Sequence, residues 1–346
     1  MSQILVEVVR EPLVEDLHRG DIAVVDADGR LLQWCGEPAR KVSFWRSSGK
    51  PFQAMPLVES GAADHWGFSE ADMAVCCASH AAEPVHQQQV LSVLTKAGLT
   101  TDVLRCGAHP PLDREEAAAL IRRGEEPGAL HSNCSGKHAG MCALAQHLGL
   151  SPEGYLEAEH GVQKLILENV TVMTDLPRSQ IAIGIDGCGV PVFGLPVYSM
   201  ALAYARLADP GGLPVPKQAA AERVYRAMTT HPHLIAGRNR FDTVLMQVAP
   251  GIVSKGGAAG ICCIGLSPER AATAGLGPHG VGIALKIEDG NNDVPRSSAA
   301  IEALVQLGVL SEGERDALRQ FHRPAVRNVA GRAVGQVRPV FRLQGE

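Results

Sequence analysis

The sequence predicts an α+β fold in which both ends of the chain supply strands to one mainly antiparallel sheet, while the middle forms a helical sub-domain. Strand-like runs rich in Val, Ile and Leu occupy the start of the chain and return near its end, and helical periodicity dominates between them. We therefore expect a single domain over residues 1–346, with a sheet sub-domain at about 1–50 and 244–346 and a helical sub-domain at about 51–243.

The first strands are expected between residues 4 and 36. The runs "ILVEVV" and "DIAVVDADGRLLQWCG" are rich in β-branched and aliphatic side chains. The second run contains Asp26-Ala27-Asp28-Gly29, a combination typical of a hairpin turn. These residues should therefore open an antiparallel sheet.

Two helices of the middle region are marked clearly by their ends. The segments "HQQQVLSVLTKAGL" (86–99) and "AGMCALAQHLGL" (139–150) each reach a glycine suited to the end of a helix. One strand pair at 180–197 interrupts the helical part.

The last third of the chain returns to strands punctuated by glycine, over residues 244–266 and 280–289. A helix is expected at 297–310, followed by an Arg-rich, strand-like tail at 334–343.

Composition bears on partners and location. The net charge of −5, the 4% content of aromatic residues and the absence of a basic run interleaved with aromatics argue against nucleic acid as a partner.

The N-terminus lacks the pattern of an export signal, and the most apolar stretch (190–205) is broken by two prolines, so we expect a cytoplasmic protein with no membrane segment. The nine cysteines are then expected to be reduced thiols, metal ligands or small buried hydrophobic residues.

The segment "RSSGKPFQAMP" (46–56) places Ser47 three residues before Lys50. A serine hydroxyl becomes an effective nucleophile when a base takes its proton, and a neutral lysine one helical turn away can do so. The chain has 24 Arg but eight Lys, and Lys50, Lys137 and Lys255 all stand in loops rich in Gly and Ser. Since lysine can lose its proton and arginine cannot, these positions indicate chemistry.

The order of the Ser and Lys positions resembles that of penicillin-recognising serine acyl-transferases: S-x-x-K, then a lone serine at Ser79, then K-G-G at Lys255. A second ammonium at Lys255 would favour the neutral form of Lys50. The structural alternative is that Ser47 or Ser48 caps a helix that begins near the following proline.

Two cysteines stand in tight loops and are candidate metal ligands. Cys134 directly precedes a predicted helix, whose N-terminus favours a thiolate, and Cys188 lies in a turn between glycines. Both can bind zinc, with water and a third ligand from Lys137, His138 or His131. Chemistry alone favours histidine, because lysine must first lose its proton. The alternative is a pair of buried, free cysteines.

Nine blocks of the sequence resemble the asparaginase II family, the class 3 or Rhizobium etli type L-asparaginases, and cover the chain from about residue 5 to 310. The blocks, in order, are "VEDLHRG", "RSSGKPFQAMP", "CCASHAAEPVH", "LRCGAHPP", "NCSGKHAGM", "IDGCGVPVFGLP", "HPHLIAGRNRFDT", "SKGGAAG" and "GIALKIEDGN".

The resemblance implies a serine β-lactamase-like fold, a homodimer and hydrolysis of L-asparagine to L-aspartate and ammonia. It also implies two Ser-Lys pairs, Ser47 with Lys50 and Ser79 with Lys255. A zinc site is implied at Cys134, Lys137 and Cys188, where the family uses lysine as the third ligand. Three further residues of the matched blocks are expected in or behind the substrate pocket: Arg46, His138 and Asp186.

The sequence departs from the family pattern at Ala259, where the pattern has glutamate, and we expect this to alter the floor of the pocket or the charge near Lys255. Two other functions remain open at this stage. One is a penicillin-recognising serine hydrolase or peptidase, and the other is a zinc-dependent amino-acid-binding protein that has no catalytic activity.

Overall fold

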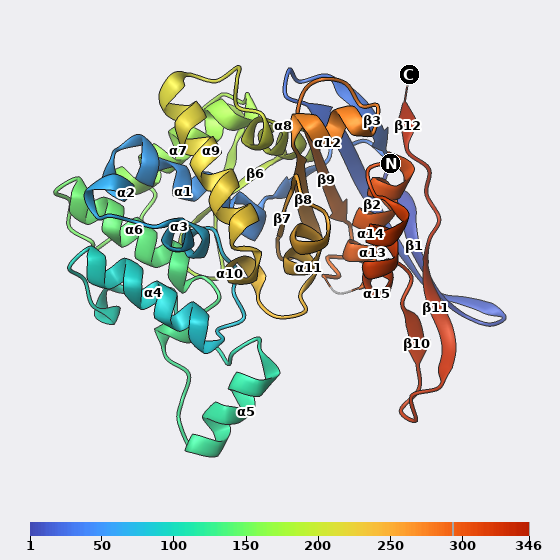
Figure 1. Cartoon of the computed structure of the whole chain (residues 1–346), viewed down its shortest axis with the longest axis horizontal. Helices are drawn as coiled ribbons and strands as arrows, with labels where there is room; N and C mark the ends of the chain where they lie inside the picture. Colours follow the sequence, from blue (N-terminus) through green and yellow to red (C-terminus); the bar gives the residue numbers. More distant parts are fainter. Residues whose placement is uncertain (293, 346) are drawn as a thin grey trace. The chain divides into compact units, whose positions relative to one another are not determined.

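The computed structural model describes residues 1–292 and 294–345 and combines helices with an antiparallel sheet (Figure 1). The chain divides into two compact units. The sheet unit comprises Met1–Ser48, Gly194–Gly212 and Val244–Glu346, and the helical unit comprises Gly49–Phe193 and Leu213–Thr243. The mixed, antiparallel architecture confirms the predicted α+β class, whereas the β-lactamase-like fold stays a prediction.

Most strands of the sheet unit form one sheet in the order β10-β11-β1-β2-β9-β8-β7, with β3 paired to β2 and β12 paired to β3. The strands of this sheet are β1 (Gln3–Arg10), β2 (Leu13–Asp26), β3 (Leu31–Cys35), β7 (Ile252–Gly256), β8 (Ile261–Leu266), β9 (Val281–Ile287), β10 (Ala325–Arg327), β11 (Ala333–Pro339) and β12 (Gln344–Gly345). The short strand β4 (Val42–Phe44) belongs to a second, smaller sheet. The helices of the sheet unit are α8 (Val197–Ala208), α12 (Pro268–Thr273), α13 (Val294–Gln306), α14 (Glu312–Ala317) and α15 (Arg319–His322).

Strands from both ends of the chain pair directly in this sheet. β1 pairs antiparallel with β11, with Val6 opposite Pro339, and β2 pairs antiparallel with β9, with Ile22 opposite Leu285. The predicted turn after Asp26 joins β2 to β3, and the Arg30 N–H donates to Asp26 Oδ1 at 2.8 Å. The prediction that the two ends share one sheet is therefore confirmed.

The central strand β9 is covered on both faces, because all seven of its residues are buried. α8 packs on β2, β8 and β9, and a Cβ atom on Gly282 would lie only 1.8 Å from the carbonyl oxygen of Ala201 in α8. Only glycine permits this close approach. α13 contacts β1, β8, β9 and β11 and lies in front of these strands in Figure 1.

The placement of α8 differs from the predicted sub-domain boundary. Residues 194–212 were expected in the helical sub-domain, but they group with the sheet unit because α8 packs on its strands. A second difference lies at residues 244–248, which were predicted as strand but form the end of α11 (Phe241–Val248). A short apolar run suits a buried helix as well as a strand, so periodicity cannot separate the two.

The helical unit packs around α1. The first eight residues of this helix, from Lys50 to Leu57, are all buried. α1 packs against α6, α7 and α9. The helices of this unit are α1 (Lys50–Glu59), α2 (Ala62–His65), α3 (Glu70–Cys76), α4 (Pro84–Lys96), α5 (Arg114–Arg123), α6 (Ser135–His147), α7 (Gly161–Thr174), α9 (Val215–Thr230) and α10 (Pro232–Ala236). The predicted strand pair forms β5 (Ala182–Ile185) and β6 (Pro191–Pro196).

Every helix in the described residues, 1–292 and 294–345, is too short or too polar to cross a membrane.

A proline inside α1 creates a hydrogen-bonding requirement that α7 meets. Pro56 has no N–H, so it cannot donate to the Phe52 carbonyl one turn earlier. The Asn169 side chain donates its Nδ2–H to this carbonyl at 2.7 Å, and its Oδ1 accepts from Lys217 Nζ at 3.0 Å. Asn169 thus stabilises the helix that begins at Lys50.

We expect Asn169→Leu to lower the free energy of unfolding by about 1–3 kcal/mol, because it leaves the buried Phe52 carbonyl without this donor. Urea denaturation followed by circular dichroism measures the loss. Adding Pro56→Ala to this variant supplies a backbone N–H for the same carbonyl, so the double variant should recover part of the stability. An Asn169→Leu protein as stable as the wild type would contradict this account.

Candidate active site

The two adjacent serines of the first motif have different environments in the sheet unit. Ser48 is fully buried, and its hydroxyl donates to the Lys255 carbonyl oxygen at 2.7 Å. The Ser48 N–H donates to the Trp45 carbonyl at 3.2 Å, and its own carbonyl accepts from the Tyr204 hydroxyl at 2.7 Å. Ser47 is partly exposed. The hydroxyl of Ser48 is therefore engaged in holding the loop, and the role of Ser47 as the nucleophile stays a prediction.

The predicted role of these serines as helix caps is not observed. The N-cap of α1 is Gly49, without a side-chain hydrogen bond, and Pro51 occupies the first turn, where its missing N–H costs nothing. The capping alternative for Ser47 and Ser48 is therefore wrong.

Lys255 lies on β7, next to the loop that carries Ser47. It is fully buried, and its Nζ donates to the Gly256 carbonyl at 2.8 Å. A Cβ atom on Gly257 would lie 3.0 Å from both Ser48 Oγ and the Trp45 carbonyl oxygen. Glycine in the K-G-G motif therefore lets β7 and this loop approach closely.

Lys50 and Ser79 contact each other in the helical unit. Lys50 is the first residue of α1 and is 1% exposed. Its Nζ lies 2.9 Å from Ser79 Oγ, 2.5 Å from the Ala78 carbonyl oxygen and 3.2 Å from the Asn133 carbonyl oxygen. The amine thus has one hydroxyl partner and two backbone acceptors.

The segment that presents Ser79 is held by several neighbours. The Ser79 N–H donates to the Ile235 carbonyl in α10 at 2.9 Å. Ala82 has a φ of 64°, in the left-handed region that alanine rarely adopts, and its N–H donates to His80 Nδ1 at 3.1 Å. Burial holds the pKa of His80 well below its ordinary value, so the neutral ring donates from Nε2 to Ser135 Oγ at 2.9 Å.

The predicted zinc ligands converge at the start of α6. Cys134 is the N-cap of this helix, and Lys137 lies in its first turn with Nζ 2.9 Å from Cys188 Sγ. Cys188 lies in a turn closed by the Asp186 N–H, which donates to the Val190 carbonyl at 2.9 Å. All three side chains are buried.

The protonation of this cluster is set by the interactions within it. A hydrogen bond from Cys188 holds the pKa of the Cys134 thiol well below its ordinary value, aided by the charges of Lys50 and Lys137 and opposed by burial. The same hydrogen bond, with burial, raises the pKa of Cys188. Burial disfavours a charge on Lys137, but the two sulfurs outweigh it and raise its pKa. These shifts favour a thiolate at Cys134, a thiol at Cys188 and an ammonium at Lys137.

This donor set suits a soft divalent cation. Cysteine sulfurs are typical zinc ligands, and a lysine nitrogen can join them once it has lost its proton; the three ligands leave a fourth position open. Binding would release protons from Cys188 and Lys137, because metal ligands must be deprotonated.

The histidines considered as the third ligand each have one ring nitrogen engaged elsewhere. His138 Nδ1 lies 2.6 Å from the Tyr155 hydroxyl, its Nε2 is buried without a hydrogen-bond partner among the described residues, and burial holds its pKa well below the ordinary value. His131 Nδ1 accepts from the Gly128 N–H at 2.9 Å. Of the three candidates, Lys137 is the one that contacts a cysteine sulfur.

Two further predicted pocket residues, Arg46 and Asp186, lie in tight turns. Arg46 begins the 3-10 turn Arg46–Gly49 with a φ of 51°. Asp186 is near enough to Lys137 to raise its pKa further. The roles of Arg46, His138 and Asp186 in substrate binding stay predictions.

Sequence reasoning missed a second group of possible ligands in the helical unit, formed by Glu83, His86 and His233. Glu83 and His86 are three residues apart in "EPVH", a spacing that places both at the start of α4. That spacing was the available signal, but nothing in the sequence shows that His233 lies beside them.

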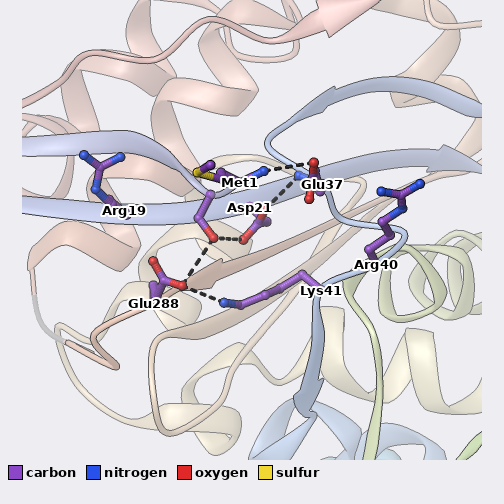
Figure 2. A pocket seen from close by; sticks show the side chains of 8 residues that line it. Met1, Arg19, Asp21, Glu37, Arg40, Lys41 and Glu288 are labelled. Carbon is purple, nitrogen blue, oxygen red and sulfur yellow. Dashed lines mark hydrogen bonds and ion pairs between the residues drawn. The ribbon is translucent and has the colours of Figure 1, made fainter.

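Figure 2 shows a charged hollow in the sheet unit, lined by Met1, Ser2, Arg19, Asp21, Glu37, Arg40, Lys41 and Glu288. The amino group of Met1 pairs with Glu37 at 2.9 Å, and Lys41 Nζ pairs with Glu288 at 2.8 Å. These charges largely satisfy each other, and the described lining includes none of the predicted site residues. We therefore place the active site elsewhere.

Comparison with known proteins identifies the family of the chain. The family model for L-asparaginase II matches residues 6–339, nearly the whole chain. No curated protein is similar enough to the chain to count as a match. The matched range contains both serines, all the lysines discussed above and both candidate zinc cysteines. The chain therefore belongs to the L-asparaginase II family and is an L-asparaginase.

Proposed function

We propose that the chain hydrolyses L-asparagine to L-aspartate and ammonia through an acyl-enzyme formed on Ser47. Ser47 Oγ attacks the carbon of the side-chain amide while Lys50 takes the hydroxyl proton. The C–N bond then breaks, and a proton passed through Ser79 and Lys255 reaches the departing nitrogen. Water hydrolyses the ester and restores Ser47.

The observation that carries this proposal is the environment of Lys50. A protonated amine has three N–H groups, and Lys50 has three acceptors: the carbonyls of Ala78 and Asn133 and the hydroxyl of Ser79. A neutral amine can keep its two N–H bonds to the carbonyls, which leaves its lone pair to take the proton of Ser47. The protonated amine then lies 2.9 Å from Ser79 Oγ, so Lys50 can hand a proton on to Ser79 as the relay requires.

The surroundings of Ser48 support the choice of Ser47 as the nucleophile. The Ser48 N–H already donates to Trp45, so the N–H of Ser47 is the candidate for stabilising the oxyanion. The pairings of Ser47 with Lys50 and of Ser79 with Lys255 stay predictions.

We also propose that Cys134, Lys137 and Cys188 bind zinc. The cation would supply Lewis acidity and a fixed charge near the substrate's α-groups. The convergence of two sulfurs and one amine in a buried site supports this assignment. The chain's own residues hold the two loops together and orient Asp186 beside Lys137.

Removing zinc with a chelator should raise KM for asparagine by about tenfold or more, corresponding to about 1.4 kcal/mol of binding, with a smaller effect on kcat. The reason is that the metal would orient the substrate and would not provide the attacking nucleophile. Steady-state kinetics before and after chelation, with elemental analysis of the same samples, tests this. Purified protein that contains no zinc and has full activity would contradict the metal proposal.

The proposed function itself is tested by measuring ammonia release from asparagine and from glutamine. We expect release from asparagine. Asparagine that stabilises the protein against heat without any release of ammonia would instead support a binding protein. The homodimer, the β-lactamase-like fold and the cytoplasmic location stay predictions.

A further inference from the structure

A second cluster of metal-ligating side chains lies in the helical unit, apart from the cysteines. Glu83 is the N-cap of α4, His86 lies in the first turn of that helix, and His233 belongs to α10. One ligand atom from each of the three residues lies within 4.8 Å of the other two. The exposed fraction is 5% for Glu83 and 0% for His86, so the cluster is mostly buried.

The hydrogen bonds of His86 leave one ring nitrogen without a partner. Its Nε2 lies 3.0 Å from the His233 carbonyl oxygen, and a carbonyl can only accept, so Nε2 carries the proton. Nδ1 then has a lone pair, is buried, and has no hydrogen-bond partner among the described residues. A histidine that donates one N–H to a backbone carbonyl and presents the other nitrogen is the usual arrangement of a metal ligand.

The carboxylate of Glu83 is oriented in a similar way. Its Oε1 accepts from the Arg238 N–H at 2.8 Å, which fixes the side chain, and its Oε2 lies 3.1 Å from His233 Nε2. The guanidinium of Arg238 lies 3.6 Å from the same Oε2, but it is 48% exposed and also pairs with Glu115. The side chain of His233 is 38% exposed, which gives an ion a route to the cluster from solvent.

We propose that Glu83, His86 and His233 form a divalent-cation site of the zinc class, distinct from the cysteine cluster. Two histidines and one carboxylate are ligands typical of zinc, and three protein ligands leave a position for water. A bound ion would link the start of α4 to α10. Since the Ile235 carbonyl in α10 accepts from the Ser79 N–H, such a link would also fix the segment that carries Ser79.

The experiment uses metal-free protein titrated with Co²⁺ and followed by absorption spectroscopy, and Zn²⁺ content is measured in parallel. The site variant is His233→Gln, chosen because the side chain of His233 is 38% exposed, so its replacement leaves the packing of the unit unchanged. The control variant is His231→Gln, a partly exposed histidine two residues away that is outside the cluster. The readout does not depend on activity.

We expect His233→Gln to bind one metal ion fewer per chain than the wild type, while His231→Gln binds the same number. The lost ion should give only d–d bands, because its ligands are nitrogen and oxygen. Ions at Cys134 and Cys188 give a thiolate-to-cobalt charge-transfer band, which His233→Gln should retain. Equal metal content in the wild type and His233→Gln would overturn the proposal, even if the thiolate band is present.

A second variant keeps the test independent of the cysteine site. In Cys134→Ser/Cys188→Ser protein, one ion with d–d bands and no thiolate band should still bind, and the further change Glu83→Gln should abolish it. If the wild type lacks the thiolate band but shows the d–d bands, the proposed cysteine site is wrong and the second site stands. Failure of the Cys134→Ser/Cys188→Ser protein to bind any ion, with its helical content unchanged, would overturn the second site.

Discussion

Replacing Lys50 by methionine is expected to lower kcat for asparagine by about 10²–10⁴-fold, the usual contribution of a general base. Methionine keeps most of the buried side-chain volume but can neither accept the proton of a serine nor donate to the carbonyls of Ala78 and Asn133. Steady-state ammonia release measures the loss. Lys164→Met is the matched control, because Lys164 is half exposed and pairs with the surface residue Glu159.

Ser79→Ala tests whether Ser79 and Lys50 act together. Each single variant breaks the 2.9 Å contact between them, so the Lys50→Met/Ser79→Ala double variant should be little worse than the poorer single variant. If the fold-losses in kcat of the two single variants multiply in the double variant, the two residues act independently. Thermal denaturation of each protein separates loss of activity from loss of folding.

The second large effect is expected at Ser47, where Ser47→Ala should reduce kcat by about 10³–10⁶-fold, as for the loss of a nucleophile in serine hydrolases. Ser47 is partly exposed, so the free energy of unfolding should change by less than about 0.5 kcal/mol. Asparagine turnover and urea denaturation of the same preparation measure both quantities.

The adjacent serine provides the matched control. Ser48→Ala removes a buried hydroxyl that donates to the Lys255 carbonyl at 2.7 Å, so it should cost about 1–3 kcal/mol of stability. It should retain far more activity than Ser47→Ala, because the reacting hydroxyl remains. The reverse result, with activity lost at Ser48 and kept at Ser47, would show that the two serines have been assigned wrongly.

Local patterns in the sequence were enough to predict much of the fold. The hairpin at Asp26 was predictable because its turn residues and the aliphatic runs on both sides all favour a hairpin. In the structure, β2 and β3 pair on either side of this turn. The helix at 297–310 corresponds to α13, Val294–Gln306. These elements depend on short-range chemistry, which a single sequence contains.

The packing of α8 could not be predicted in the same way. The sequence that begins at residue 197 predicts a helix but does not indicate which unit the helix packs on. Its place in the sheet unit depends on its close contact with Gly282, more than 70 residues later in the chain. Likewise, the apolar run at 244–248 carries no periodicity that separates strand from helix. Long-range contacts decided both cases.

The candidate site was predictable as a set of residues but not as a set of contacts. Spacing identified Ser47 and Lys50, yet the structure alone shows that Lys50 contacts Ser79 and that Ser48 is a buried structural group. It also shows Lys137 next to Cys188, where ligand chemistry alone had favoured histidine. Residues from distant segments meet only when the chain is folded, and the spacing of residues within one segment does not show which distant residues they will contact.

The most direct test of the central claim is to trap the covalent intermediate. With hydroxylamine present during turnover, an acyl-enzyme divides between hydrolysis and formation of β-aspartyl hydroxamate, and acid quenching followed by peptide mass spectrometry locates the acyl group. We predict hydroxamate formation and an aspartyl ester on Ser47, both absent from Ser47→Ala protein. An aspartyl ester on Ser79, or turnover that forms neither hydroxamate nor ester, would contradict the account.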